Sequence, residues 1–216
     1  MVYGLMCCFL PCYTKRGGQA YDQEEAPRPV KLKSKNRESG ATAIEAPLQK
    51  SVSARQAHSQ LVASLSQPMN GKQTAALFRL RMAFSARKEH LSAEFFAPAI
   101  KDVDTVLFSG CLGDRIIVDW VNMPTTSRRI LQGISLPHGI SRITKVKIRL
   151  NRVMFEGESK EDIWGTVVHE MVHAYLALTC GWRGMLMRHH GSPFEECCRA
   201  AVGRLALEGL GVRHVV

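Results

Sequence analysis

The stretch from Trp164 to Phe194 limits what this chain can fold into more than any other part of its sequence. It reads WGTVVHEMVHAYLALTCGWRGMLMRHHGSPF, with His169 and His173 four residues apart around Glu170. On an α-helix, residues at this spacing lie on one face, about one turn apart. Most of the surrounding residues are apolar, so the pattern predicts a buried helix that points both imidazoles in the same direction.

The HExxH spacing indicates a metal site with hydrolytic chemistry. Two imidazoles on one helix face can bind a single Zn²⁺ at about 2.0–2.1 Å each. Glu170, beside the first histidine, can reach a zinc-activated water without binding the metal. The alternative is a core helix whose histidines are only hydrogen-bonded, but burying three such groups without partners would be costly. We therefore predict His169 and His173 as zinc ligands and Glu170 as the general base.

The residues alone leave two classes of third ligand open. A metzincin pattern requires histidine at position 179, which is Thr179, so that class is excluded. A thermolysin-like site would take a glutamate from a later helix, and Glu195 and Glu196 lie at a tolerable distance along the chain. His190, before Gly191 at the start of a helix, could instead fold back over the first helix. Three histidines would leave a fourth position for water.

Several segments together resemble the SprT-like (Spartan) zinc metalloprotease domain. The family shows HExxHAYL followed by HGxxF, and this chain has IWGTVVHEMVHAYL followed by HHGSPF. Upstream, LFSGCLGDRIIVDWVNM and SRITKVKIRLNRVMF are similar to the family's strand-bearing segments. The likeness covers about residues 103–210.

This resemblance implies a ligand set of His169, His173 and His190, with Glu170 as the catalytic base. His189 stands directly before the HG pair, where the family often has glycine. The implied activity is that of a zinc metalloendopeptidase, which hydrolyses peptide bonds through a zinc-activated water. Nucleic-acid-associated proteins are a candidate substrate class, although Spartan's role in cleaving DNA-crosslinked proteins does not transfer automatically to this chain. A non-catalytic zinc-containing binding module and a membrane-tethered adaptor remain alternatives.

Hydrophobic periodicity predicts an α+β domain with a small sheet. The resemblance implies that this is a zincin-like SprT domain, with an HExxH helix, a small sheet and flanking helices. The expected order is a helix from about 73 to 90, a shorter helix after Pro98, strands at 115–121 and 145–151 separated by turns or a long loop, a helix from 159 to 181, and a last helix after Ser192. Strand 145–151 is expected to offer an edge to an extended substrate. Ser159 with Asp162, and Ser192 with Glu195, suggest capping boxes.

The N-terminal part has a different composition. From residue 17 to about 71 it is rich in Gly, Pro, Ser, Gln, Lys and Glu, without sustained periodicity. Such a segment cannot bury enough apolar surface to offset its ordering entropy. We therefore predict two parts, a disordered basic tail over 1–72 and a SprT-like metallopeptidase domain over 73–216. The tail's cysteines Cys7, Cys8 and Cys12 could accept palmitate, although unmodified thiols are the simpler interpretation.

Charge and cysteine usage limit the compartment and the partners. The net charge is +10, which favours acidic partners. The seven cysteines form no CxxC pair, so a secreted disulfide framework is poorly supported. A nuclear or cytoplasmic location follows, with protein substrates as partners. Nucleic acid could contact the basic tail or the loop 181–190, although packing of that loop over the HExxH helix is the favoured interpretation. Membrane could contact the N-terminal cysteines.

Overall fold

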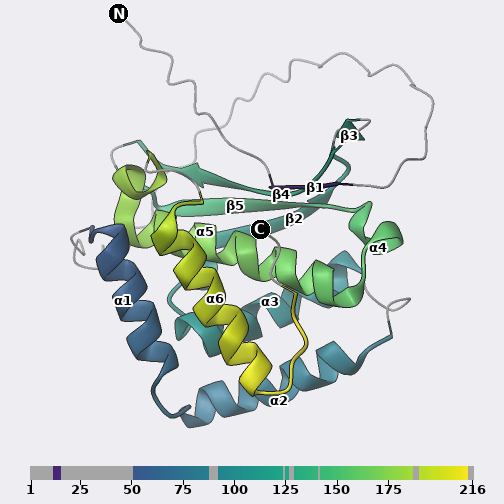
Figure 1. The fold of residues 1–216 in the computed structure, drawn as a ribbon, viewed down its shortest axis with the longest axis horizontal. Coiled ribbons are helices and arrows are strands. Elements are labelled where there is room, and N and C mark those ends of the chain that lie inside the picture. Colours follow the sequence, from purple (N-terminus) through teal and green to yellow (C-terminus); the bar gives the residue numbers. More distant parts are fainter. Residues whose placement is uncertain are drawn as a thin grey trace, which may run out of the picture.

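The computed structural model describes residues 12–15, 51–87, 92–123, 125–126, 129–140, 142–186 and 190–213. Figure 1 shows these residues as a sheet with helices packed beneath it, which confirms the predicted α+β class. The elements in chain order are β1 (Cys12–Lys15), α1 (Ala54–Leu65), α2 (Gly71–Ser85), α3 (Ala93–Phe108), the short 3₁₀ turn η2 (Gly113–Arg115), β2 (Ile116–Val121), β3 (Thr125–Thr126), β4 (Arg129–His138), β5 (Lys145–Asn151), α4 (Met154–Gly157), α5 (Lys160–Leu186) and α6 (Ser192–Leu207).

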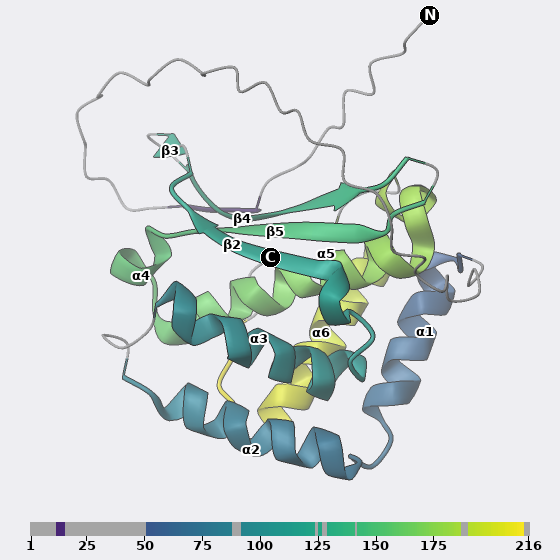
Figure 2. The ribbon, with the colours of Figure 1, turned by 180° about the vertical axis from the view of Figure 1, so that it is seen from behind.

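The sheet has the strand order β1-β4-β5-β2, with β3 also paired to β4. Strand β5 is parallel to β2 and antiparallel to β4, and β1 is antiparallel to β4. Both predicted strands are confirmed as β2 and β5. The expectation that strand 145–151 offers an edge is wrong, because β5 is hydrogen-bonded on both sides. Figure 2 shows that the helices lie on one side of this sheet.

Strand β4 replaces much of the loop expected between the two predicted strands. Gly133 and Pro137 suggested turns, but both lie within β4, where Gly133 pairs with Leu150 and Pro137 with Val146. A proline lacks the N–H that a central strand needs, so it is tolerated where a strand runs at an edge. No partner on the far side of β4 is recorded for Ile134–His138 within the described strands.

Helix α1 corrects the predicted extent of the disordered tail. Ala57 and Leu61 are buried, and Ser53 caps the helix by accepting a hydrogen bond from Gln56 N. Tyr175 Oη of α5 donates to the Ala57 carbonyl over 3.0 Å. The prediction of disorder is therefore wrong for this helix, whose apolar positions are sparse among Ser, Gln and Arg. Residues 1–11, which include Cys7 and Cys8, and residues 16–50 of the predicted tail lie outside the described residues.

Helices α2 and α3 follow the prediction with two corrections. The spacing of Leu77, Leu80, Met82 and Phe84 predicts one buried face of α2; Leu77, Leu80 and Phe84 are buried, but Met82 is 63 % exposed. Helix α3 begins before Pro98, not after it, because Ser92 provides the N-cap by accepting from Phe95 N. Asp104 lies near the end of α3, where its carboxylate accepts from Leu112 N and Gly113 N and stabilises the turn into β2.

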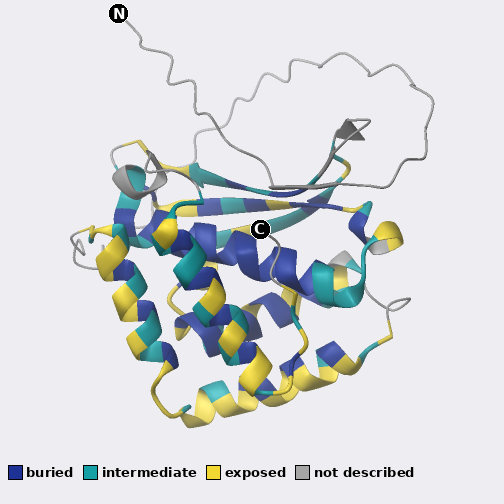
Figure 3. Cartoon of the chain, in the orientation of Figure 1, coloured by how far each residue is buried: buried dark blue, intermediate teal, exposed yellow. Residues whose placement is uncertain are grey.

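Helix α5 is the central element of the core. At its first turn, Ser159 Oγ accepts from Asp162 N over 3.1 Å, which is one half of the predicted capping box. In Figure 3 this helix is buried along most of its length between the sheet and the other helices. Gly181, the predicted stop, has φ 67° and ψ −161°, which breaks the helical geometry before the last residues. None of the described helices is long and apolar enough to cross a membrane.

Helix α6 starts differently from the prediction. Its N-cap is Gly191, which makes no side-chain capping bond, and Ser192 is the first helical residue. The Ser192 hydroxyl donates to Glu196 Oε1 over 2.6 Å. The predicted capping box with Glu195 is therefore wrong. Cys197 and Cys198 of this helix are both fully buried.

Candidate metal centre

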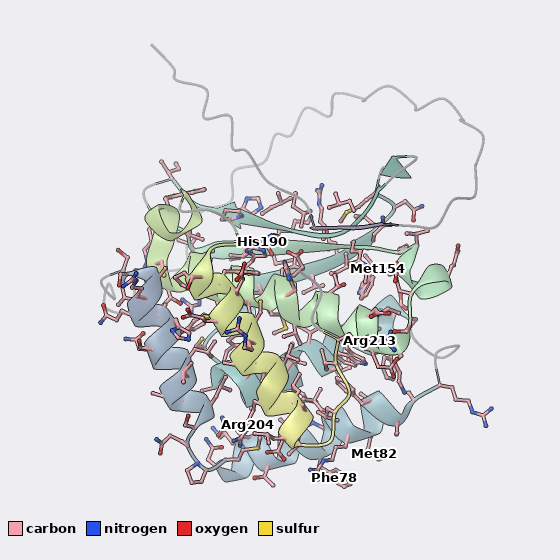
Figure 4. All side chains as sticks on the ribbon, in the orientation of Figure 1. Phe78, Met82, Met154, His190, Arg204 and Arg213 are labelled. Atoms are coloured by element: carbon pink, nitrogen blue, oxygen red, sulfur yellow. The ribbon has the colours of Figure 1, made fainter. Side chains whose placement is uncertain are left out.

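Two histidines of α5 and one from the turn before α6 converge at one point under the sheet. His169 and His173 lie on α5, and His190 lies just before α6, where Figure 4 shows it close to α5. The ring centroids of His169 and His173 are 4.9 Å apart, and those of His169 and His190 are 5.0 Å apart. One nitrogen from each ring lies within 4.8 Å of the others. The structure thus brings together the three ligands that the family resemblance implied.

The spacing of these nitrogens fits a zinc ion. Two ligands at 2.0–2.1 Å in a tetrahedral arrangement are separated by about 3.3 Å. The Nε2 atoms of His173 and His190 are 3.3 Å apart. His169 is 3 % exposed and His173 is 9 % exposed, whereas His190 is only half-buried, so the centre is shielded from bulk water on the α5 side and more open at His190. The donor set, its convergence and its burial therefore suit a metal ion held by three imidazoles.

Phe194 on α6 holds the three imidazoles in place from one side. Its ring stacks on His173 with centroids 4.1 Å apart. It also lies 4.8 Å from the His169 ring and 4.9 Å from the His190 ring. Because Phe194 is only 5 % exposed, this contact also limits access of water to the histidines from the α6 side. The sequence contained this residue within HGxxF, but its packing role becomes visible only in the fold.

Strand β4 fixes the position of Glu170. The Ser135 hydroxyl donates to Glu170 Oε2 over 2.6 Å and lies 3.1 Å from the Glu170 carbonyl oxygen. A Cβ added at Gly133 would lie 2.8 Å from both Cγ and Oε1 of Glu170, so only glycine fits without displacing the carboxylate. Thr166, one turn earlier on α5, donates to buried Gln132. Sequence reasoning missed these β4 residues, because it interpreted the segment as a loop.

The glutamates considered as alternative ligands are not part of this cluster. Among the described residues, the group that could hold a metal consists of the three histidines. Glu196 instead accepts from Ser192 and lies 3.3 Å from Nδ1 of His58 on α1. The hydrogen bond from Ser192 lowers the pKa of Glu196 below its ordinary value. His189 lies outside the described residues.

Buried cysteines near the centre are poor candidates for chemistry. Burial raises the pKa of Cys180 to about 11 and that of Cys197 to about 12. Burial also raises the pKa of Cys198, and the nearby negative charge of Glu170 adds to this shift. A thiol is nucleophilic and binds metal as the thiolate, so these groups stay inert at neutral pH.

Comparison with known proteins agrees with this site. The model of the SprT-like family matches residues 97–209, which is just over half of the chain and includes all three histidines and Glu170. No curated protein matches the chain. No solved structure matches it. With the family match spanning strands β2 to β5, the HExxH helix and the last helix, the chain belongs to the SprT-like family.

Proposed function

We propose that this domain is a zinc metalloendopeptidase that hydrolyses peptide bonds with Glu170 as the general base. One observation carries the proposal. Three imidazoles converge on one point, and Glu170, which directly follows the first of them in the sequence of α5, is buried and held by Ser135 of β4. Three protein ligands with an adjacent carboxylate are typical of hydrolytic zinc sites, whereas structural zinc sites usually have four protein ligands.

The mechanism divides the work between the metal and the chain. When bound by the three histidines, zinc supplies a Lewis acid that acidifies water and polarises a peptide carbonyl. Glu170 accepts a proton from the attacking water and returns it to the leaving amine. The hydrogen bond from Ser135 restricts rotation of the Glu170 carboxylate, so that the base is held in place before substrate arrives. Phe194 and the core under the sheet keep bulk water away from the imidazoles.

The edge of β4 is the proposed binding path for substrate. An extended peptide can add to a sheet edge through main-chain hydrogen bonds alone, without requiring a particular side-chain sequence. Strand β4 carries Gly133 and Ser135, which contact Glu170, so a peptide along its outer edge would pass close to the base. The edge of β4 thus replaces the predicted edge of β5, because both edges of β5 are paired, one with β4 and the other with β2.

Partners beyond protein substrates are proposals that rest on charge and composition. The net charge of +10 supports contact with nucleic acid through the basic tail or the loop 181–190. Such contact would place the enzyme near nucleic-acid-bound proteins in the nucleus or cytoplasm. The N-terminal cysteines support an alternative contact with membrane.

Metal content provides the first test of this proposal. We expect one tightly bound zinc per chain, because one three-histidine cluster is found among the described residues and the sequence has no CxxC pair. Elemental analysis of protein purified with zinc supplementation and then desalted would measure this ratio. Two zinc ions per chain, or none, would contradict the site as described.

Replacing Ser135 with alanine tests how the base is held. The variant removes the O–H donor to Glu170 and leaves a buried acceptor with one partner fewer, which typically costs about 1–3 kcal/mol. We expect kcat to fall about tenfold, which is less than the roughly 10²–10⁴-fold that a positioned base contributes in full, while KM and zinc content stay unchanged. Ser135→Thr keeps the hydroxyl and should recover most of kcat. An unchanged kcat in Ser135→Ala would show that this bond does not position Glu170.

A further inference from the structure

The outer edge of β4 already has an occupant from the same chain. Strand β1 pairs with it in antiparallel orientation, with Cys12 opposite Gly133 and Lys15 opposite Arg129. Figures 1 and 2 show β1 against β4, and the strand order places it on the side away from β5. We infer that this edge is a peptide-docking surface and that Cys12–Lys15 binds it in cis, in competition with substrate. The competition with substrate rests on the peptidase function proposed above.

The register places this segment next to the catalytic glutamate. Neighbouring strands lie about 4.8 Å apart, so the backbone at Cys12 runs one strand spacing from Gly133. Gly133 also lies against Glu170, because a Cβ added at Gly133 would clash with the Glu170 side chain. Strand β1 therefore begins opposite Gly133, the β4 residue next to Glu170, and its chain leads away from Glu170 towards Lys15. A substrate paired to the same residues of β4 would have to follow the same path.

A strand edge accepts one partner at a time. The inner edge of β4 is bonded to β5 from Gly133 to His138. Strand β1 covers the outer edge from Arg129 to Gly133, and β3 pairs with only Arg129 and Ile130 of β4. An extended substrate that uses main-chain bonds at Leu131 to Gly133 must therefore displace β1. The two states are mutually exclusive at the residues nearest Glu170.

The tether makes this competition effective but reversible. Residues 16–50 connect β1 to the domain, so pairing is intramolecular. The entropic cost of closing a connection grows slowly with its length. A tethered segment then competes at an effective concentration on the order of millimolar or below. The pairing spans only four residues, which keeps it weak enough for a substrate or a partner of the tail to displace it.

The test uses the full chain with β1 disrupted. Adjacent N–H groups of a strand point to opposite sides, so the double substitution Tyr13→Pro/Thr14→Pro removes a donor facing β4 whichever residue supplies it. The matched control, Ala41→Pro/Thr42→Pro, puts two prolines elsewhere in the tail. Both pairs are made in the zinc-loaded Glu170→Gln chain, and binding of a fluorescein-labelled peptide spanning residues 9–18 is followed by fluorescence anisotropy.

We expect the Tyr13/Thr14 variant to bind this peptide about fivefold or more tightly than the parent and the control, because its docking edge is no longer occupied. With Glu170 restored, KM for an extended peptide substrate should fall by a similar factor while kcat is unchanged. Equal affinities in all three chains would overturn the inference. Because the binding measurement needs no turnover, it decides the inference even if no variant cleaves peptide, an outcome that would count only against the proposed peptidase function.

Discussion

His190→Ala is expected to lose most of its zinc while keeping the fold. Two imidazoles on α5 remain, but they hold the ion poorly without the nitrogen that His190 brings to 3.3 Å from His173. Loss of a hydrogen-bonding partner of a ligand already costs roughly 10–100-fold in metal affinity, and loss of a ligand should cost more. Zinc affinity measured by competition with a chromophoric chelator would quantify the change, and circular dichroism would confirm the fold.

Two further variants make this result specific. Glu195→Ala is the control on α6, and we expect its zinc affinity to match that of the parent, because the cluster contains histidines and not this carboxylate. His189→Ala should matter much less than His190→Ala, since the family pattern places the ligand at the HG position. If Glu195→Ala lost zinc while His190→Ala kept it, the site would be thermolysin-like and the ligand assignment would fall.

Glu170→Gln is expected to retain zinc and lose peptidase activity. The amide has nearly the same shape as the carboxylate, and its oxygen can still accept the hydrogen bond from Ser135. It cannot accept a proton from water at neutral pH, and a positioned general base typically contributes about 10²–10⁴-fold to the rate. Steady-state cleavage of a quenched fluorescent peptide, with zinc content measured in parallel, would separate the two effects. Equal turnover by Glu170→Gln and the parent would exclude Glu170 as the base.

The parts of the fold predicted from sequence are those with strong local patterns. The apolar periodicity around His169 and the cap at Ser159 predict the HExxH helix, because the apolar spacing of a long buried helix recurs over many turns. The alternation of Val146, Ile148 and Leu150 with basic residues predicts both ends of β5, because one face of this strand is buried against the helices. The α5 part of the centre was therefore predictable from spacing alone.

The parts that sequence reasoning missed depend on contacts between distant segments. Strand β4 contains Gly133 and Pro137, which locally favour turns, and it forms because β5 pairs with it. Since β4 was interpreted as a loop, the contacts of Gly133 and Ser135 with Glu170 could not be expected. Helix α1 carries few apolar residues, and its order comes from burial of Ala57 and Leu61 against other helices. No local pattern encodes such tertiary stabilisation.

Cleavage of casein by the full chain, with and without zinc, tests the central claim most directly. The protein would be stripped with a chelator, assayed, reloaded with one equivalent of zinc and assayed again, in the presence and absence of single- and double-stranded DNA. New N-termini would be identified by mass spectrometry. The three-histidine centre with its adjacent Glu170 predicts no cleavage by the stripped protein and restored cleavage after zinc is added. A reloaded protein that holds one zinc per chain but generates no new N-termini, with or without DNA, would contradict the assignment as a peptidase.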